Sequence, residues 1–227
     1  MFKKIVLSII LFGSIFATDK QKVILITGTA HGIGKSTAQY LIDKGHIVYG
    51  GDILIEENLY LNDIGGVALE MDVTKQDHVD NAINKIIAEQ GRIDVLVNNA
   101  GTVRDRTLMR MTDEEFDEVI AVNLRGTWAC SRAAARAMKD DGGHIINIIS
   151  GSAFTGPIGQ TNYAAAKAGV ASMMRCWAFE LERYGIRSNS LWPLALTDMT
   201  QVILERNQAL AEKEGRPLPS PQDLGLG

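Results

Sequence analysis

The 227-residue sequence has little that would cross-link the chain or bind a metal. Its two cysteines, Cys130 and Cys176, cannot form a disulfide framework, and the sequence has no CxxC or HExxH zinc pattern. Lysine and arginine (23) are outnumbered by aspartate and glutamate (27) and form no run, which argues against nucleic acid as a partner. With 46% hydrophobic and 22% charged residues, the composition is that of an ordinary globular domain.

Long apolar runs are also absent, apart from a short one at the N-terminus. Lys3 and Lys4 precede the run Ile5–Ala17, which is shorter than the roughly 20 residues that a membrane-spanning helix needs. A positive start, a short apolar centre and a small residue at the end predict a secretory signal peptide or a membrane anchor over residues 1–17. A buried core element is the remaining alternative.

Beyond this segment, short apolar runs alternate with amphipathic patterns, and no linker divides residues 19–199. The apolar runs predict strands at Lys22–Thr27, His46–Gly50, Ile93–Val97, His144–Ile149 and Arg187–Trp192. The helices are expected at Gly34–Lys44, after an N-cap at Thr74, from a capping box of Thr112 and Glu115 through Val122, at Thr127–Lys139 and at Tyr163–Tyr184. This alternation predicts an α/β fold, a Rossmann-type doubly wound parallel sheet in a single domain.

A glycine-rich turn, TGTAHGIG (27–34), follows the first expected strand. Its three glycines allow backbone N–H groups at the start of the next helix to approach a pyrophosphate. Asp52 ends the second expected strand, where a carboxylate can accept hydrogen bonds from an adenosine ribose and repel a 2′-phosphate. No lysine or arginine follows in residues 53–55. The turn therefore predicts a dinucleotide cofactor, with NAD favoured over NADP.

Tyr163 and Lys167 are four positions apart, on one face of an expected helix. We expect the ammonium of Lys167 to lower the pKa of the Tyr163 phenol from about 10 toward a value useful in proton transfer. Ser150 ends the preceding strand, where its hydroxyl could hold a substrate carbonyl oxygen. For the pair alone, a half-buried aromatic beside a solvated lysine is an equally simple explanation.

Together these motifs resemble the short-chain dehydrogenase/reductase family over Lys22–Met199. The order of the turn, Asp72-Val73, NNAG (98–101), VNLRG and NIIS…YAAAK is that of the family. The resemblance implies that Tyr163 is the acid/base, Ser150 orients the carbonyl, and Lys167 lowers the tyrosine pKa and holds the nicotinamide ribose. Asn123 would position a water in a proton relay. The implied cofactor-binding residues are Thr27, Gly28, His31, Gly32, Ile33, Gly34, Asp52, Asp72, Val73, Asn99, Ala100, Gly101, Tyr163, Lys167, Pro193 and Thr197.

Residues 104–127 look most like the 3-oxoacyl-carrier-protein reductases and 3-hydroxyacyl-CoA dehydrogenases. The resemblance implies an NAD(P)-dependent oxidoreductase without a metal that interconverts a secondary alcohol and a ketone. The favoured small-molecule substrate is a 3-hydroxyacyl/3-oxoacyl thioester of fatty acid metabolism. A dehydrogenase of steroids, sugars or other small alcohols and a non-catalytic nucleotide-binding fragment remain open. Arg104 and Arg106 are interpreted as solvated loop charges.

Two features depart from the family pattern. Leu194 follows Pro193 where the family usually has glycine, and leucine does not readily adopt the backbone angles open to glycine. After the prolines of residues 217–221 we expect no strand, so the domain at 19–227 lacks the family's final strand, which argues against the family-typical homo-oligomer. The location in the cell also stays open, because residues 1–17 indicate secretion or membrane anchoring and the cofactor indicates a cytoplasm-facing enzyme.

Overall fold

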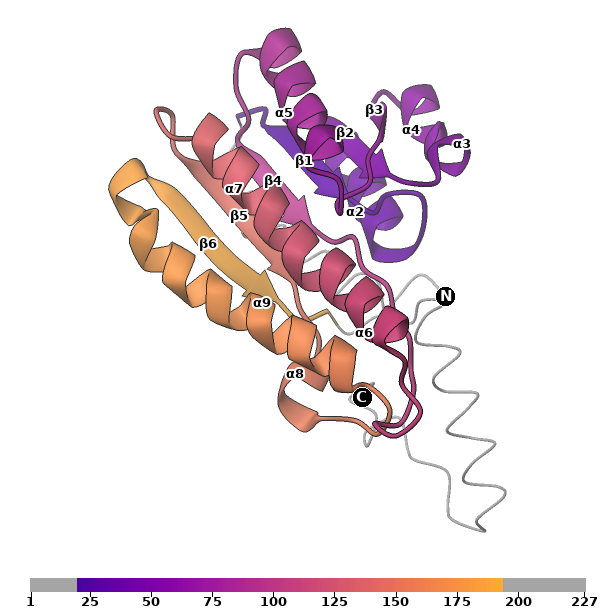
Figure 1. Ribbon diagram of the computed structural model, residues 1–227. Coiled ribbons are helices and arrows are strands. Elements are labelled where there is room, and N and C mark those ends of the chain that lie inside the picture. Colours follow the sequence, from indigo (N-terminus) through magenta and orange to yellow (C-terminus); the bar gives the residue numbers. More distant parts are fainter. Residues whose placement is uncertain (1–19, 194–227) are drawn as a thin grey trace. The chain divides into compact units, whose positions relative to one another are not determined.

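A computed structural model of the chain describes residues 20–193 (Figure 1). The predicted signal peptide or anchor, Thr197 and the expected absence of a final strand fall outside this range. Within residues 20–193, every helix is too short or too polar to cross a membrane.

Six parallel strands form one sheet in the order β3-β2-β1-β4-β5-β6. Because the order reverses between β1 and β4, the predicted doubly wound sheet is confirmed, and the carboxyl ends of these two strands flank the switch point. The strands are β1 (Val23–Thr27), β2 (Ile47–Asp52), β3 (Val67–Glu70), β4 (Val95–Asn98), β5 (Gly143–Ile148) and β6 (Ile186–Leu191).

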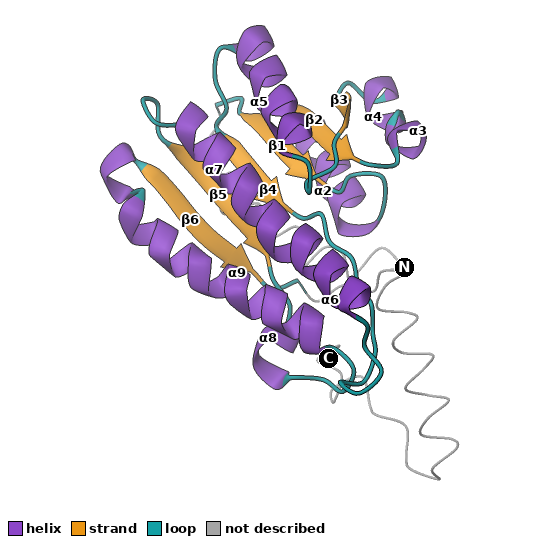
Figure 2. Ribbon diagram, in the orientation of Figure 1, coloured by secondary structure: helices purple, strands orange, loops and turns teal. Residues whose placement is uncertain are grey.

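Helices connect these strands, and α5, α7 and α9 lie along one face of the sheet (Figure 2). The connections between parallel strands are right-handed. Because they run in opposite directions on the two sides of the switch point, α2 lies on the other face of the sheet. The helices are α2 (Gly32–Asp43), α3 (Ile55–Asn58), α4 (Tyr60–Asp63), α5 (Gln76–Gln90), α6 (Asp113–Ile120), α7 (Thr127–Ala137), α8 (Ser152–Thr155) and α9 (Thr161–Glu180). A π-helical turn, Ala121–Gly126, joins α6 to α7, and a 3₁₀ turn, Glu182–Tyr184, follows α9.

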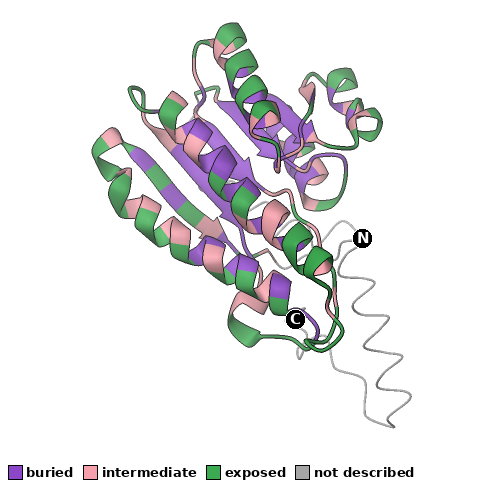
Figure 3. Cartoon of the chain, viewed as in Figure 1, coloured by how far each residue is buried: buried purple, intermediate pink, exposed green. Residues whose placement is uncertain are grey.

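The larger described part of the core lies between the sheet and the helices α5 and α7. Apolar side chains from all six strands and both helices form one cluster there, which includes the fully buried Leu25, Leu96, Ile86 and Ala134. The central strands are buried on both sides, whereas the helices expose their outer faces (Figure 3). This burial fixes the carboxyl edge of the sheet, from which the loops of the site emerge.

Three local predictions need correction. The strand β3 was not expected, because it has four residues, lies at the sheet edge and buries only Leu69. The N-cap of α5 is Lys75 rather than Thr74, whose hydroxyl instead donates to Asp72 (2.6 Å). The helix expected through Tyr184 ends at Glu180. The capping box of Thr112 and Glu115 is confirmed.

Candidate active site

The glycine-rich turn lies at the switch point, where its shape depends on the absence of side chains. Gly28 has φ +74°, in the left-handed region, and an added Cβ there would lie 2.8 Å from the Ala100 Cα. At Gly34 a Cβ would lie 1.9 Å from the Gly28 carbonyl oxygen. The start of α2 therefore packs directly on the turn, a geometry that suits a phosphate-binding turn.

Two of the predicted cofactor-binding residues hold this turn against the end of β4. The Thr27 hydroxyl accepts hydrogen bonds from the N–H groups of Asn99 (3.1 Å) and Ala100 (3.0 Å). The Asn99 side-chain amide donates to the carbonyls of Thr27 (3.0 Å) and Gly28 (2.9 Å). Thr27 and Asn99 therefore fix the backbone of the turn that the sequence predicts to hold a dinucleotide.

Asp52 lies beside the turn at the end of β2. Its carboxylate accepts hydrogen bonds from the N–H groups of Ala30 (2.9 Å) and Leu54 (3.0 Å), which fixes the negative charge next to the start of α2. Burial, together with this charge, raises the pKa of the neighbouring Tyr60 to about 12. His31, the residue before α2, is exposed and pairs with Glu57 (2.6 Å). This end of the turn is rich in carboxylates.

Asp72 and Val73 follow β3 and lie in a tight turn. Partial burial acts to raise the pKa of Asp72, but hydrogen bonds from the Thr74 side chain and backbone, together with Lys75, lower it overall. Val73 is buried, and a Cβ at Gly126 would lie 2.7 Å from one of its methyl groups. These contacts fix both residues in the loop that follows β3.

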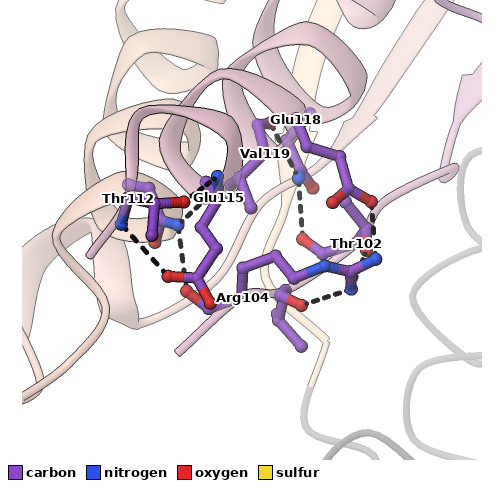
Figure 4. Close-up of polar contacts among 9 residues, drawn as sticks. Thr102, Arg104, Thr112, Glu115, Glu118 and Val119 are labelled. Atoms are coloured by element: carbon purple, nitrogen blue, oxygen red, sulfur yellow. Dashed lines mark hydrogen bonds and ion pairs between the residues drawn. The ribbon is translucent and has the colours of Figure 1, made fainter. Parts of the chain in front are cut away.

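Asn123 lies in the π-helical turn and is fully buried. Its amide donates to the carbonyls of Thr102 (2.8 Å) and Val119 (3.1 Å) (Figure 4). Its Oδ1 has no partner among the described residues. A Cβ at Gly101 would lie 2.6 Å from this oxygen and 3.7 Å from the Lys167 Nζ, so both groups border the same small space. An acceptor held there suits the predicted relay through water.

Lys167 is buried on α9, and its ammonium donates to the Ile148 carbonyl (2.9 Å). Burial lowers the pKa of Lys167 to about 8. Its Nζ lies 5.6 Å from the centroid of the Tyr163 ring. The structure therefore brings together the two residues that the sequence placed on one helix face.

The prediction that Lys167 lowers the pKa of Tyr163 is wrong for the protein without a cofactor. Burial raises the pKa of Tyr163, a hydrogen bond with Ser150 lowers it, and the Asp105 carboxylate raises it further. The Lys167 ammonium donates its hydrogen bond to the Ile148 carbonyl rather than to the phenol. An acidic Tyr163 would require additional positive charge near the ring, and the cation of an oxidised nicotinamide would supply it.

Sequence reasoning missed the residues that hold Tyr163 and Ser150 in place. Asn162 is buried; its Oδ1 accepts from the Tyr163 N–H (2.7 Å), and its amide donates to the carbonyls of Arg104 (3.0 Å) and Glu115 (3.0 Å). The start of α9 is thereby tied to the loop 102–111 and to α6. Only the position of Asn162 next to the tyrosine could have indicated this role.

Arg104 and Arg106, in the loop 102–111, are paired rather than simply solvated. Arg104 pairs with Glu118 (2.6 Å) and also donates to the Thr102 hydroxyl (3.2 Å), as Figure 4 shows. Arg106 pairs with Glu115 (3.2 Å). Since both partners lie on α6, these pairs hold the loop against that helix.

The residues present fit a dinucleotide. A turn with no room for a Cβ at Gly28 or Gly34, the start of a 12-residue helix and a fixed carboxylate follow one another from β1 to β2. Gly28, Gly32 and Gly34 would hold the pyrophosphate, and Asp52 the adenosine ribose. Pro193 follows β6 and is half-buried. No group of acidic, histidine or cysteine side chains within residues 20–193 could hold a metal ion.

Comparisons with known proteins agree with this geometry. The family model for short chain dehydrogenases matches residues 22–208. The 3-oxoacyl-[acyl-carrier-protein] reductase FabG of Thermotoga maritima is 41% identical over 199 residues, which cover 84% of this chain and 80% of that protein. FabG of Escherichia coli is 39% identical over 213 residues (89% and 86%). The crystal structure of a short chain dehydrogenase from Mycobacterium smegmatis superposes with a TM-score of 0.71 at 39% identity and covers 75% of each chain.

Proposed function

Because the chain belongs to the short-chain dehydrogenase family, we propose that it interconverts 3-oxoacyl and 3-hydroxyacyl thioesters, with NAD as its preferred cofactor. The observation that carries the proposal is the grouping of Ser150, Tyr163 and Lys167 beside a glycine turn suited to a dinucleotide. The names of the FabG relatives support the substrate class. The cofactor supplies or accepts the hydride.

The side chains of the chain then handle the proton. In the reducing direction the Tyr163 hydroxyl donates its proton to the substrate oxygen, and the Ser150 hydroxyl donates a hydrogen bond to the same oxygen. Lys167, whose ammonium lies beside the Tyr163 ring, would hold the nicotinamide ribose, and the free Oδ1 of Asn123 can hold a water from which the proton is replaced.

Apolar side chains around this group support an acyl substrate. Leu108 and Met109 on the loop 102–111 are 76% and 97% exposed, and Phe154 and Ile158 near α8 are 62% and 85% exposed. Both segments are linked to the Ser150–Tyr163 region by hydrogen bonds. Exposed large apolar side chains next to a reactive centre are typical of a surface that covers an apolar ligand.

The test of this function uses the full-length chain with NADH and acetoacetyl-CoA, a 3-oxoacyl thioester, beside ketone forms of a steroid and a sugar. We expect NADH to be consumed with acetoacetyl-CoA and 3-hydroxybutyryl-CoA to appear in equal amount. Turnover of only the steroid or sugar would overturn the thioester assignment while leaving the oxidoreductase intact.

The preference for NAD is tested at Asp52. Replacing Asp52 by alanine removes the carboxylate that would repel a 2′-phosphate, so we expect the ratio of kcat/KM for NADH over NADPH to fall at least about tenfold. Asp43→Ala removes an exposed charge at the end of α2 and should leave the ratio unchanged. A wild-type protein that prefers NADPH would contradict the cofactor assignment.

A further inference from the structure

A chain of side-chain hydrogen bonds runs from Ser150 away from the reactive centre. The Ser150 hydroxyl lies 3.3 Å from the Ser152 hydroxyl, and its oxygen also accepts from the Ser152 N–H (3.2 Å). The Ser152 hydroxyl donates to the Gln160 Oε1 (2.7 Å). The Gln160 amide donates to both carboxylate oxygens of Asp105 (3.3 Å each). Three segments, the end of β5, the start of α9 and the loop 102–111, meet in this chain.

The chemistry of these groups fixes which group donates and which accepts at each step of this chain of hydrogen bonds. An ionised carboxylate only accepts hydrogen bonds, so Asp105 fixes the NH₂ end of the Gln160 amide and turns the carbonyl end toward Ser152. The Ser152 hydrogen is then committed to Gln160, and Ser152 offers Ser150 a lone pair. Ser150 is thus held by the N–H and the hydroxyl oxygen of Ser152, in addition to its hydrogen bond with Tyr163. Because the contact with the Ser152 hydroxyl is long (3.3 Å), the Ser150 hydrogen can turn to a substrate oxygen.

Gln160 cannot contact the substrate itself in this arrangement. Only 5% of its surface is exposed, and both ends of its amide are occupied. The segments around it are also joined independently of its side chain, because the Arg106 N–H donates to the Gly159 carbonyl (2.8 Å) and Arg106 bridges to Gln160 through the backbone. Loss of the amide should therefore disturb Ser150 more than the fold.

We propose that Gln160 is a positioning residue that acts on Ser150 through the Ser152 hydroxyl, with Asp105 setting the orientation of its amide. The inference rests on the proposed function, because it assigns Ser150 to the substrate oxygen. It adds to that function a second layer of residues, none of which touches the reacting atoms.

The test compares Gln160→Met with wild type, using NADH and acetoacetyl-CoA, or whichever ketone of the panel the wild type reduces. Methionine keeps the length and fills the buried space but cannot hydrogen-bond to Ser152. We expect kcat to fall about tenfold, equivalent to about 1.4 kcal/mol in the barrier. KM for NADH should stay unchanged. Thr161→Ala, at the exposed next position, is the control and should keep the wild-type kcat.

Two further variants separate positioning from a general structural effect. The double variant Asp105→Asn with Gln160→Glu exchanges the donor and the acceptor. The new amide at position 105 can donate to the new carboxylate at position 160, which still accepts from Ser152. We expect this variant to recover most of the lost kcat. In a Ser150→Ala background, Gln160→Met should lower kcat no further.

The outcomes distinguish this inference from the proposed function. A wild-type kcat in Gln160→Met, or an equal loss caused by Gln160→Met with and without Ser150, would overturn the positioning role. A wild-type protein that reduces no ketone of the panel would overturn the proposed function. If Gln160→Met lowers kcat and the double variant Asp105→Asn with Gln160→Glu does not recover it, the donors and acceptors assigned to this chain of hydrogen bonds are wrong.

Discussion

Replacing Tyr163 by phenylalanine is expected to lower kcat for ketone reduction by about a thousandfold, the range of a lost general acid. The ring would keep its packing on α9 and its 5.6 Å distance to the Lys167 ammonium, so the change removes the proton donor and little else. Because burial raises the pKa of Tyr163, the phenol is protonated at neutral pH and ready to act in the reducing direction. The measurement is steady-state consumption of NADH, with NADH fluorescence recording cofactor binding in parallel.

The control for this variant is Tyr184→Phe, at the end of the 3₁₀ turn that follows α9. Arg183 stacks on the Tyr184 ring at 4.8 Å and would stack on phenylalanine in the same way. We expect Tyr184→Phe to retain wild-type turnover, and both variants to bind NADH as the wild type does. An unchanged kcat in Tyr163→Phe would remove Tyr163 from the proposed chemistry.

Replacing Gly34 by alanine is expected to weaken NADH binding by about a hundredfold, because it displaces the turn and the helix start that would hold the pyrophosphate. The new Cβ would lie 1.9 Å from the Gly28 carbonyl oxygen and 2.5 Å from the Asn99 Nδ2, so the turn and the start of α2 must move apart. Because part of this contact is with backbone, no rotamer change relieves it, and stability should fall by about 1–3 kcal/mol as well. Fluorescence titration gives the Kd, and thermal unfolding gives the stability.

Gly45→Ala separates the loss of binding from the loss of stability. Gly45 follows α2 with φ +81° and has no atom within 4 Å of an added Cβ, so alanine there costs only backbone strain of about 1–2 kcal/mol. We expect a lower Tm with an unchanged Kd for NADH. If Gly34→Ala bound NADH as tightly as Gly45→Ala does, the turn would not be the cofactor site.

The sheet could be predicted from the sequence where strands are buried on both faces. The run that became β1 is apolar nearly throughout, and the run that became β5 is short and rich in isoleucine, so composition and length identify both without tertiary information. β3 could not be predicted, because an edge strand with one buried residue owes its pairing to β2 rather than to its own pattern. Thr74 has the right side chain for an N-cap, but the nearby Asp72 takes its hydroxyl.

For the site, the sequence predicted the identity of the residues but not their surroundings. The spacing of Tyr163 and Lys167 correctly placed them together, whereas the sign of the Tyr163 pKa shift depends on burial and on Asp105, which lies 58 positions away in the chain. Thr27 and Asn99 likewise hold the turn through contacts between distant segments. The same is true of the hydrogen bonds that run from Ser150 to Gln160. Such contacts leave no periodic signal in one sequence.

The most direct test of the central claim is single-turnover mixing of the NADH-bound full-length protein with acetoacetyl-CoA. The account predicts that bound NADH is oxidised in step with the appearance of 3-hydroxybutyryl-CoA, and that Tyr163→Phe binds NADH but leaves it reduced. A wild-type protein that binds NADH and oxidises none of it with any ketone of the panel would show a nucleotide-binding protein without the proposed chemistry.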